Sequence, residues 1–435
     1  MNARTTALSA LIAMRRQNAW ADGALKDNTA RARLDRRDAA LAARLLYGVV
    51  QNRMLLDFYL AQAVASPLTK LQPVVLDILR LGAYQILFLD KIPVSAAVNE
   101  AVEQTKTYAN KRAAGLVNGS LRTLARRRDE LVQPHDLATK YSHPQPLVDC
   151  LRASMDDETL EAFLAADNDI PKTALQVNPL KAAPEQVAAA LDEAGVAYEP
   201  HPWLHGCFLV SGTGNLEALP LFQSGAVCVQ DAAAKLAVLA SGAAPGMRVL
   251  DCCAAPGGKS FAAAMQMENT GSILSCDLHA HKISLIEKNA DRLGISIIKA
   301  EQRSAAEFDP ALEAQFDLVI ADVPCSGLGV IRKKPDIRYK PLDAIERLPD
   351  VQRAILETVS RYVRPGGALL YSTCTVRKEE NEDVVLPFLQ AHPAFSLEPF
   401  PVPAGLDLPN EGYVTLLPHK HAADGFFICK LRKHA

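Results

Sequence analysis

The sequence lacks the run of about 20 apolar residues that a membrane-spanning helix needs. The most apolar stretch, residues 236–244, is interrupted by Ser241 and Gly242. The first 18 residues carry three arginines in a helical pattern and no cleavage-like site, so they do not resemble a secretory signal. We therefore expect a cytoplasmic protein without a membrane partner.

The sequence also lacks the cysteine spacing of a disulfide framework or a zinc site. Its nine cysteines are spread along the chain, with no CxxC pair and no compact cluster with histidine. An odd number of scattered cysteines in a long chain favours reduced thiols. We expect free cysteines and no bound metal.

The 435 residues have an ordinary hydrophobic and charged content, and the length suggests two or three domains. Charge is unevenly distributed, because residues 1–140 hold 21 Lys and Arg against 12 Asp and Glu, a net charge of +9. The remainder has a net charge of −11. The basic end suggests a polyanionic partner, although a solvated helical face would have the same composition.

Hydrophobic spacing predicts three regions. Residues 1–135 are expected to be all-helical, with helices near residues 5–18, 38–65, 73–89, 95–108 and 113–128. A proline-rich linker is expected at 133–147, followed by a small α+β module at 147–229. From residue 230 onward, apolar strands alternate with helices, which predicts a doubly wound α/β domain at 230–435 with an antiparallel edge near its C-terminal end.

The first strand of this domain runs into a loop of small residues. The loop matches neither GxGxxG nor GxxxxGK[ST], so a dinucleotide or a nucleoside triphosphate would lack its phosphate-binding motif. Asp277, at the end of the second strand, is expected where ribose hydroxyls bind in this architecture. A nucleoside ligand without phosphates fits this loop better. The alternative explanations are that the loop is a simple turn and that Asp277 caps a helix. The expected loop residues are Cys253, Ala254, Ala255, Pro256, Gly257, Gly258 and Lys259.

Two cysteines follow two later strands. Cys325 comes after the strand ending at Asp322, and Cys374 comes after the strand at 368–372. Neighbouring strands lie about 5 Å apart, so both thiols would face one pocket. This grouping suits methylation at C5 of cytosine: one thiolate adds to C6, a carboxyl group supports the addition, and a base removes the C5 proton. Either cysteine alone could equally be a core residue, and spacing does not decide which thiol attacks.

With these residues in view, the chain resembles the Sun-type ribosomal RNA cytosine-C5 methyltransferases of the NOL/NOP2/Sun family, which carry an N-terminal NusB-like domain. The resemblance rests on three motifs in the catalytic region, namely DCCAAPGGK at 251–259, DVPCSG at 322–327 and STC at 372–374. In the helical region, ILRLGAYQ at 78–85 and VNGSLR at 117–122 are similar to the NusB-like domain.

The resemblance implies a Rossmann-like domain that binds S-adenosyl-L-methionine and methylates 16S ribosomal RNA, not DNA. We expect free or early-assembly RNA as the partner and take a monomer as the default state. It implies that Cys374 is the nucleophile and that Cys325 assists release of the product. The implied cofactor contacts are residues 253–259, Asp277, Asp322 and the position of Arg303. The family usually has an acidic residue near Arg303, beside the adenine, so this chain departs from the pattern there.

The target cytosine must be unpaired or extruded to reach the thiols. The segment at 331–340 holds five cations and a tyrosine and is a candidate phosphate grip, although such loops are often only solvated. Two other functions stay open from the residues alone. One is a small-molecule methyltransferase on the same sheet, and the other is a NusB-like RNA-binding protein with an inert catalytic half.

Overall fold

The computed structural model describes residues 1–214 and 216–435 and divides into two compact units. The first unit contains residues 1–169 and 331–340, and the second contains 170–330 and 341–435. The domain limits predicted above stay predictions. The segment 331–340 folds with the helical unit although it lies in sequence between Cys325 and Cys374.

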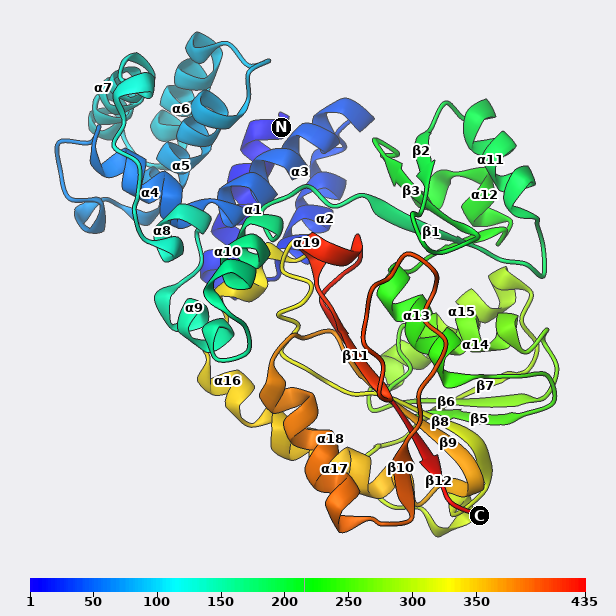
Figure 1. Ribbon diagram of the computed structural model, residues 1–435. Coiled ribbons are helices and arrows are strands. Elements are labelled where there is room, and N and C mark those ends of the chain that lie inside the picture. The colour runs from blue at the N-terminus through cyan, green and yellow to red at the C-terminus, as the bar shows by residue number, and fades with distance from the viewer. Residues whose placement is uncertain (215) are drawn as a thin grey trace. The chain divides into compact units, whose positions relative to one another are not determined.

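The first unit is helical, as predicted (Figure 1). Polar side chains begin several of its helices: Asn2, Asp35 and Asn110 each accept a hydrogen bond from the backbone N–H three residues later. Fully buried leucine and isoleucine side chains, such as Leu45 and Ile78, form its core. Its helices are α1 (Ala3–Gln17), α2 (Ala21–Ala32), α3 (Arg36–Gln51), α4 (Arg53–Ala61), α5 (Pro73–Phe88), α6 (Val94–Tyr108), α7 (Lys111–Arg126), α8 (Leu137–Tyr141), α9 (Gln145–Arg152) and α10 (Asp157–Ala166), with 3₁₀ turns η1 (Leu68–Lys70), η2 (Arg128–Glu130) and η5 (Pro335–Tyr339).

Two predictions for this unit were wrong. The helix expected at 38–65 is interrupted at Asn52, whose side-chain amide donates to the Gly48 carbonyl at 2.9 Å and so competes with the helical bonding pattern. The linker expected at 133–147 contains α8 and the start of α9. Here Asp136 caps α8, and Pro144 and Pro146 occupy the first positions of α9, where proline starts a helix.

The second unit begins with a small antiparallel sheet in the strand order β2-β3-β1-β4. Its strands are β1 (Thr173–Val177), β2 (Ala197–Pro200), β3 (Cys207–Ser211) and β4 (Val227–Val229), with helices α11 (Pro184–Glu193) and α12 (Pro220–Gln223) and the turn η3 (Leu216–Ala218). The predicted α+β character of this module is confirmed.

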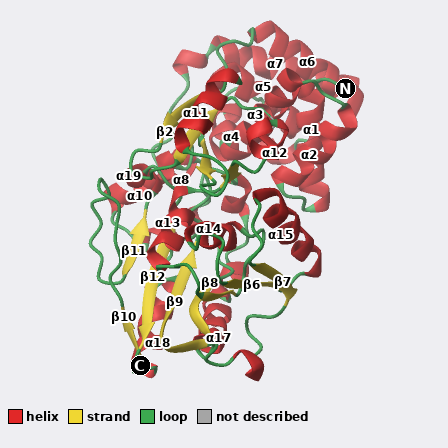
Figure 2. Cartoon of the chain, turned by 90° about the vertical axis from the view of Figure 1, so that its right-hand side faces the viewer, coloured by secondary structure: helices red, strands yellow, loops and turns green. Residues whose placement is uncertain are grey.

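The catalytic part of the unit is built on a larger sheet with the order β10-β12-β9-β8-β5-β6-β7, and β11 pairs with β12. β9, β8, β5, β6 and β7 run parallel, whereas β12 joins β9 in antiparallel orientation. Figure 2 shows β10, β12 and β9 side by side at this edge. The strands are β5 (Arg248–Asp251), β6 (Ser272–Asp277), β7 (Ile298–Gln302), β8 (Phe316–Asp322), β9 (Val363–Thr373), β10 (Phe395–Leu397), β11 (Tyr413–Leu416) and β12 (Phe426–Lys433).

Helices cover both faces of this sheet, which confirms the doubly wound architecture (Figure 1). Side chains alternate along β8: Leu318 and Ile320 join the core beneath α13, α14 and α15, while Val319 and Ala321 join the core beneath α17 and α18. Because β5 to β9 run parallel, their carboxyl ends meet at one edge of the sheet, where ligands bind in such sheets. The helices and turns are α13 (Ala232–Ser241), α14 (Gly258–Gln266), α15 (Ala280–Leu293), α16 (Asp343–Glu346), α17 (Leu348–Ser360), α18 (Glu382–Ala391), α19 (Pro418–His421), η4 (Pro310–Leu312) and η6 (Lys378–Glu380).

Candidate active site

The loop between β5 and α14 is tightly folded. The backbone N–H of Cys252 donates to Ile320 O at 2.9 Å, and that of Ala254 donates to Cys276 O at 2.8 Å, so the loop is tied to both neighbouring strands. Gly257 has φ of +109°, and a Cβ there would lie 2.3 Å from the Phe261 ring. Only glycine fits this position.

A buried polar chain that the sequence reasoning did not assign lies beneath this loop. Asp251 Oδ2 accepts a hydrogen bond from Ser260 Oγ at 2.7 Å, and Ser275 Oγ donates to Ser260 Oγ at 2.7 Å. Burial raises the pKa of Asp251 to about 7. These residues connect β5, β6 and α14 and fix the start of the cofactor loop.

Asp277 and Arg303 meet at the ends of β6 and β7. The backbone N–H of Arg303 donates to Asp277 O at 3.0 Å. The Asp277 carboxylate accepts from the backbone of His279 at 3.0 Å and pairs with Lys282 at 3.5 Å. The Arg303 guanidinium pairs with Glu301 at 3.1 Å and also with the carboxylate of Asp309. Arg303 thus lies beside the predicted cofactor corner, with its charge engaged by two carboxylates.

The residues of this corner fit S-adenosylmethionine. Gly257 lets the loop turn tightly against the Phe261 ring at the carboxyl end of β5, which is where ligands bind in such sheets. Asp277 supplies a carboxylate at a strand end, where it can accept hydrogen bonds from ribose hydroxyls. The backbone of 253–259 with Asp277, Arg303 and Asp322 is therefore the set that would hold the cofactor.

The two cysteine loops follow adjacent parallel strands, because β8 pairs with β9 and Asp322 is in register with Ser372. Cys325 Sγ and Cys374 Sγ lie 3.0 Å apart, and both residues are partly exposed. The backbone N–H of Cys374 donates to Cys325 Sγ at 3.3 Å, and that of Gly329 donates to Cys374 O at 3.0 Å. The structure thus brings together the two predicted thiols.

Asp322 joins the cofactor loop to the cysteines. Its Oδ2 lies 2.6 Å from Lys259 Nζ, and its Oδ1 accepts from Ser372 Oγ at 2.8 Å. The Lys259 side chain is 10% exposed and that of Asp322 is 31% exposed, so the carboxylate is the more accessible partner. A ligand entering between the loop and the thiols could therefore reach Asp322.

The two thiols differ in their electrostatic surroundings. The pKa of Cys374 is lowered because Cys325 donates a hydrogen bond to its sulfur, and the charge of Lys259 acts in the same direction. The pKa of Cys325 is raised well above its usual value by the same hydrogen bond, by burial and by the negative charge of Glu380. Cys374 is the thiol that more readily becomes the thiolate.

Two members of the predicted phosphate grip at 331–340, Arg338 and Tyr339, are engaged within the helical unit. Arg338 is 1% exposed and donates to the Gln51 carbonyl at 2.8 Å and to Asn168 Oδ1 at 3.0 Å. The Arg53 guanidinium stacks 3.5 Å from the centre of the Tyr339 ring. Arg338 is therefore a structural anchor within the helical unit, while Lys334 remains exposed.

Within residues 1–214 and 216–435, no group of three or more His, Cys, Asp or Glu side chains is placed to hold a metal ion. Over the same residues, no helix has the length and apolar content to cross a membrane.

Known proteins resemble the chain in all three of its regions. Family models match it as 16S rRNA methyltransferase RsmB/F at residues 239–432, as the NusB family at 1–126, and as the RsmF/B-like ferredoxin-like domain at 143–217. The "Probable ribosomal RNA small subunit methyltransferase B" of Bacillus subtilis (strain 168) is 38% identical over 99% of this chain and 98% of its own length. The ribosomal RNA small subunit methyltransferase B of Vibrio cholerae serotype O1 is 32% identical over 100% and 98%.

Solved structures with a similar fold are also known. The crystal structure of PH0851 superposes with a TM-score of 0.82 at 27% identity and covers 98% of both chains. A methyltransferase homolog protein from Pyrococcus horikoshii superposes with a TM-score of 0.60 at 25% identity, over 68% of this chain and 98% of that one. The resemblance to Sun-type enzymes, the predicted fold class and the predicted S-adenosylmethionine cofactor are confirmed at the level of the family. The chain belongs to the ribosomal RNA small subunit methyltransferase B family.

Proposed function

We propose that this protein transfers a methyl group to C5 of a cytosine in 16S ribosomal RNA through a covalent bond between Cys374 and C6. The observation that carries the proposal is the pair of thiols 3.0 Å apart beside Asp322, next to the cofactor loop. A methyltransferase acting on a nucleophilic oxygen or nitrogen has no need of two adjacent thiols. Methylation of a pyrimidine carbon does need a thiolate, because C5 becomes nucleophilic only after addition at C6.

Cys374 is our assignment for the nucleophile. The hydrogen bond from the Cys325 thiol and the charge of Lys259 both favour the Cys374 thiolate. The thiolate adds to C6 and leaves an enamine with electron density at C5. Asp322 is exposed enough to accept a hydrogen bond from the N4 amino group of the cytosine and so supports the addition.

S-adenosylmethionine supplies the activated methyl group when it is bound by residues 253–259, Asp277, Arg303 and Asp322. Loss of the C5 proton to a base then restores the aromatic ring, and the electron pair of the C6–S bond returns to Cys374. The Cys325 thiol is placed to assist this release, because it can donate a hydrogen bond to the departing sulfur. We assign Cys325 to product release.

The substrate assignment draws on the relatives, which are named as methyltransferases of small-subunit ribosomal RNA. The basic helical unit supports it, since lysine and arginine attract a phosphate backbone. We infer that the substrate is free or early-assembly RNA, because C6 must be accessible to the thiol, and that the protein acts as a monomer. Such a substrate would place the activity in the cytoplasm.

Bisulfite sequencing tests the proposal directly. Unmodified 16S ribosomal RNA is incubated with the purified protein and S-adenosylmethionine, and Cys374→Ala serves as the matched control. We expect one cytosine to become resistant to bisulfite with the intact protein and none with the variant. If methyl groups enter the RNA but no cytosine becomes resistant, the C5 assignment is wrong.

A further inference from the structure

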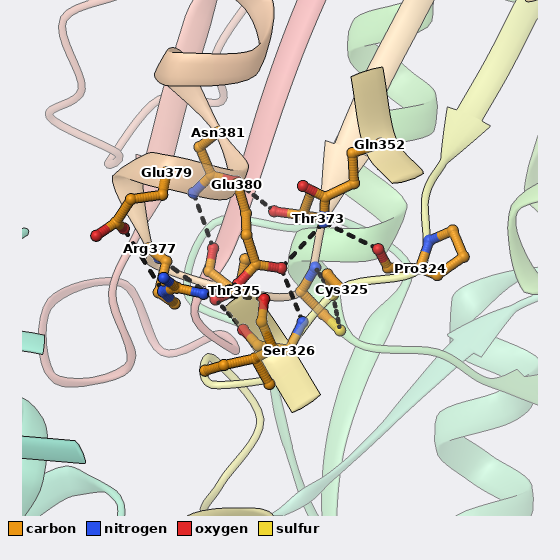
Figure 3. Close-up of polar contacts among 12 residues, drawn as sticks. Pro324, Cys325, Ser326, Gln352, Thr373, Thr375, Arg377, Glu379, Glu380 and Asn381 are labelled. Carbon is orange, nitrogen blue, oxygen red and sulfur yellow. Dashed lines mark hydrogen bonds and ion pairs between the residues drawn. The ribbon is translucent and has the colours of Figure 1, made fainter. Parts of the chain in front are cut away.

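Two buried side chains hold the residues on either side of Cys325 (Figure 3). Gln352, on α17, donates from Nε2 to Pro324 O at 2.9 Å, and Glu380, in η6, accepts from the Ser326 backbone N–H at 2.8 Å. The same Gln352 amide also donates to Glu380 Oε2 at 3.0 Å. The two side chains therefore form a closed bracket around Cys325, with Pro324 and Ser326 at its ends.

The Gln352–Glu380 bracket also reaches the strand end that carries Cys374. Ser326 Oγ donates to Thr375 Oγ1 at 2.8 Å, which ties the residue after Cys325 to the residue after Cys374. Tyr371, on β9, donates its hydroxyl to the Glu380 carbonyl at 2.7 Å. Any shift of Glu380 would therefore move the two cysteine loops relative to each other.

Gln352 and Glu380 are buried, so their polar atoms need hydrogen-bond partners within the protein. Gln352 and Glu380 are both 0% exposed, and burying a carboxylate is unfavourable unless its oxygens are fully paired. Here Oε2 accepts two hydrogen bonds, and Oε1 pairs with Arg377 Nη1 at 3.3 Å. Apolar side chains of similar size could fill this space, but they could not hold Pro324 and Ser326 at fixed positions. Gln352 and Glu380 are thus better explained by the need to fix the positions of Pro324 and Ser326 than by a gain in the stability of the fold.

We propose that Gln352 and Glu380 are positioning residues that hold the Cys325 thiol in hydrogen-bonding contact with Cys374. Both side chains bond to the backbone on either side of Cys325, so they hold its position through that backbone. The inference deepens the proposed function and rests on it for the roles of the two thiols. Without the bracket, Cys325 would drift from Cys374, which would weaken the thiolate and slow product release.

The first experiment uses no RNA. In Gln352→Met, the amide is replaced by a side chain of similar length that cannot form either hydrogen bond. Iodoacetamide alkylation of Cys374 is followed by peptide mass spectrometry from pH 6 to 10 in the full-length protein. We expect the midpoint of the pH profile to rise by about half a unit to one unit, which corresponds to roughly three- to tenfold slower alkylation below the midpoint.

Gln85→Met is the matched control, because Gln85 is also a buried, hydrogen-bonded glutamine but lies in α5 of the helical unit. Its midpoint should match that of the unmodified protein. If Gln352→Met does not fold, Gln352→Asn replaces it, since its amide is one methylene too short to reach both partners. An unchanged midpoint in a folded Gln352 variant would overturn the positioning role.

The second experiment follows the RNA adduct on denaturing gels. Gln352→Met should form the adduct within about tenfold of the normal rate, in line with its smaller thiolate fraction, yet accumulate it as Cys325→Ala does, since attack survives and release is slowed. Loss of turnover without accumulation would contradict this inference. If the alkylation midpoint shifts but Cys325→Ala itself accumulates no adduct, the positioning role stands and the proposed division of work between the thiols fails.

Discussion

Cysteines lie at strand ends in two regions of the same sheet, and their pKa values are shifted in opposite directions in Cys276 and Cys374. Cys252 follows β5 and Cys276 lies near the end of β6, whereas Cys325 and Cys374 follow β8 and β9. Burial raises the pKa of Cys276 to about 12, and it also raises the pKa of Cys252 well above its usual value. The pKa of Cys374 is instead lowered by the hydrogen bond from Cys325.

The difference teaches that position at a strand end does not make a cysteine reactive. Cys252 and Cys276 are part of the apolar core with Val319 and Tyr371, where burial disfavours a thiolate and, at Cys276, outweighs the stabilising effect of Arg303. Cys374 is partly exposed and has both a thiol donor and the charge of Lys259 nearby. A reactive thiol therefore requires a stabilising partner as well as access.

The largest expected effect is that of Cys374→Ala. Methyl transfer should fall by at least about 10³-fold and the RNA adduct should disappear, because removing a nucleophile eliminates the covalent route. Transfer of tritium from labelled S-adenosylmethionine and a denaturing gel shift measure the two quantities. An adduct formed by this variant would mean that the roles of the two thiols are reversed.

The next effect is that of Cys325→Ala. Turnover should fall by about 10²-fold while the denaturant-stable adduct accumulates, because Cys374 still attacks but is not helped to leave. The amount of adduct per enzyme, set beside that of the unmodified protein, separates slow release from slow attack. Equal loss of adduct and turnover would argue against a role in release.

A smaller effect is expected for Lys259→Met. Its charge lowers the pKa of Cys374, so its loss should raise that pKa, reduce the thiolate fraction near neutral pH and slow iodoacetamide alkylation of Cys374 a few-fold. Cys276, with a pKa of about 12, should react at neither neutral nor mildly alkaline pH in either protein. Alkylation of Cys276 as fast as that of Cys374 would remove the distinction between the two regions.

The smallest effect on activity is expected for Cys429→Ser. Cys429 on β12 is fully buried in the apolar core, so a hydroxyl there should destabilise the fold by about 1–3 kcal/mol. Activity per folded molecule should stay within about twofold of normal, since Cys429, like Cys252 and Cys276, is a buried core cysteine. Urea unfolding and methyl transfer under native conditions measure these two quantities.

Much of the fold could be predicted from the sequence. The strands expected to end at Asp322 and Asp277 are β8 and β6 and end at those residues, because mostly apolar side chains lead up to each aspartate. α2 was missed because only Ala21 and Ala24 of its residues are buried, so it has no apolar stripe. β10 was missed because it is three residues long.

The sequence was enough to predict the site residues that lie at strand ends. It was not enough to predict the residues that contact them from distant parts of the chain. Asp322 ends β8, Cys325 lies three residues beyond it and Cys374 directly follows β9, so alternation of strands and helices was enough to place each of them at a strand end. Gln352 lies 28 residues from both Pro324 and Glu380 and looks like any polar residue of an amphipathic helix. Nothing in its local sequence distinguishes it from a solvated glutamine.

The sequence alone therefore determined most of the strands and helices and placed each of the two thiols beyond a strand end, because hydrophobic periodicity is a local property. Only the tertiary structure shows how the surroundings of Cys325 and Cys374 differ, because these surroundings include Glu380 and Lys259, which are distant in sequence from the thiols that they act on. It also decided that Arg338 is a buried anchor, because its hydrogen-bond partners come from helices far along the chain.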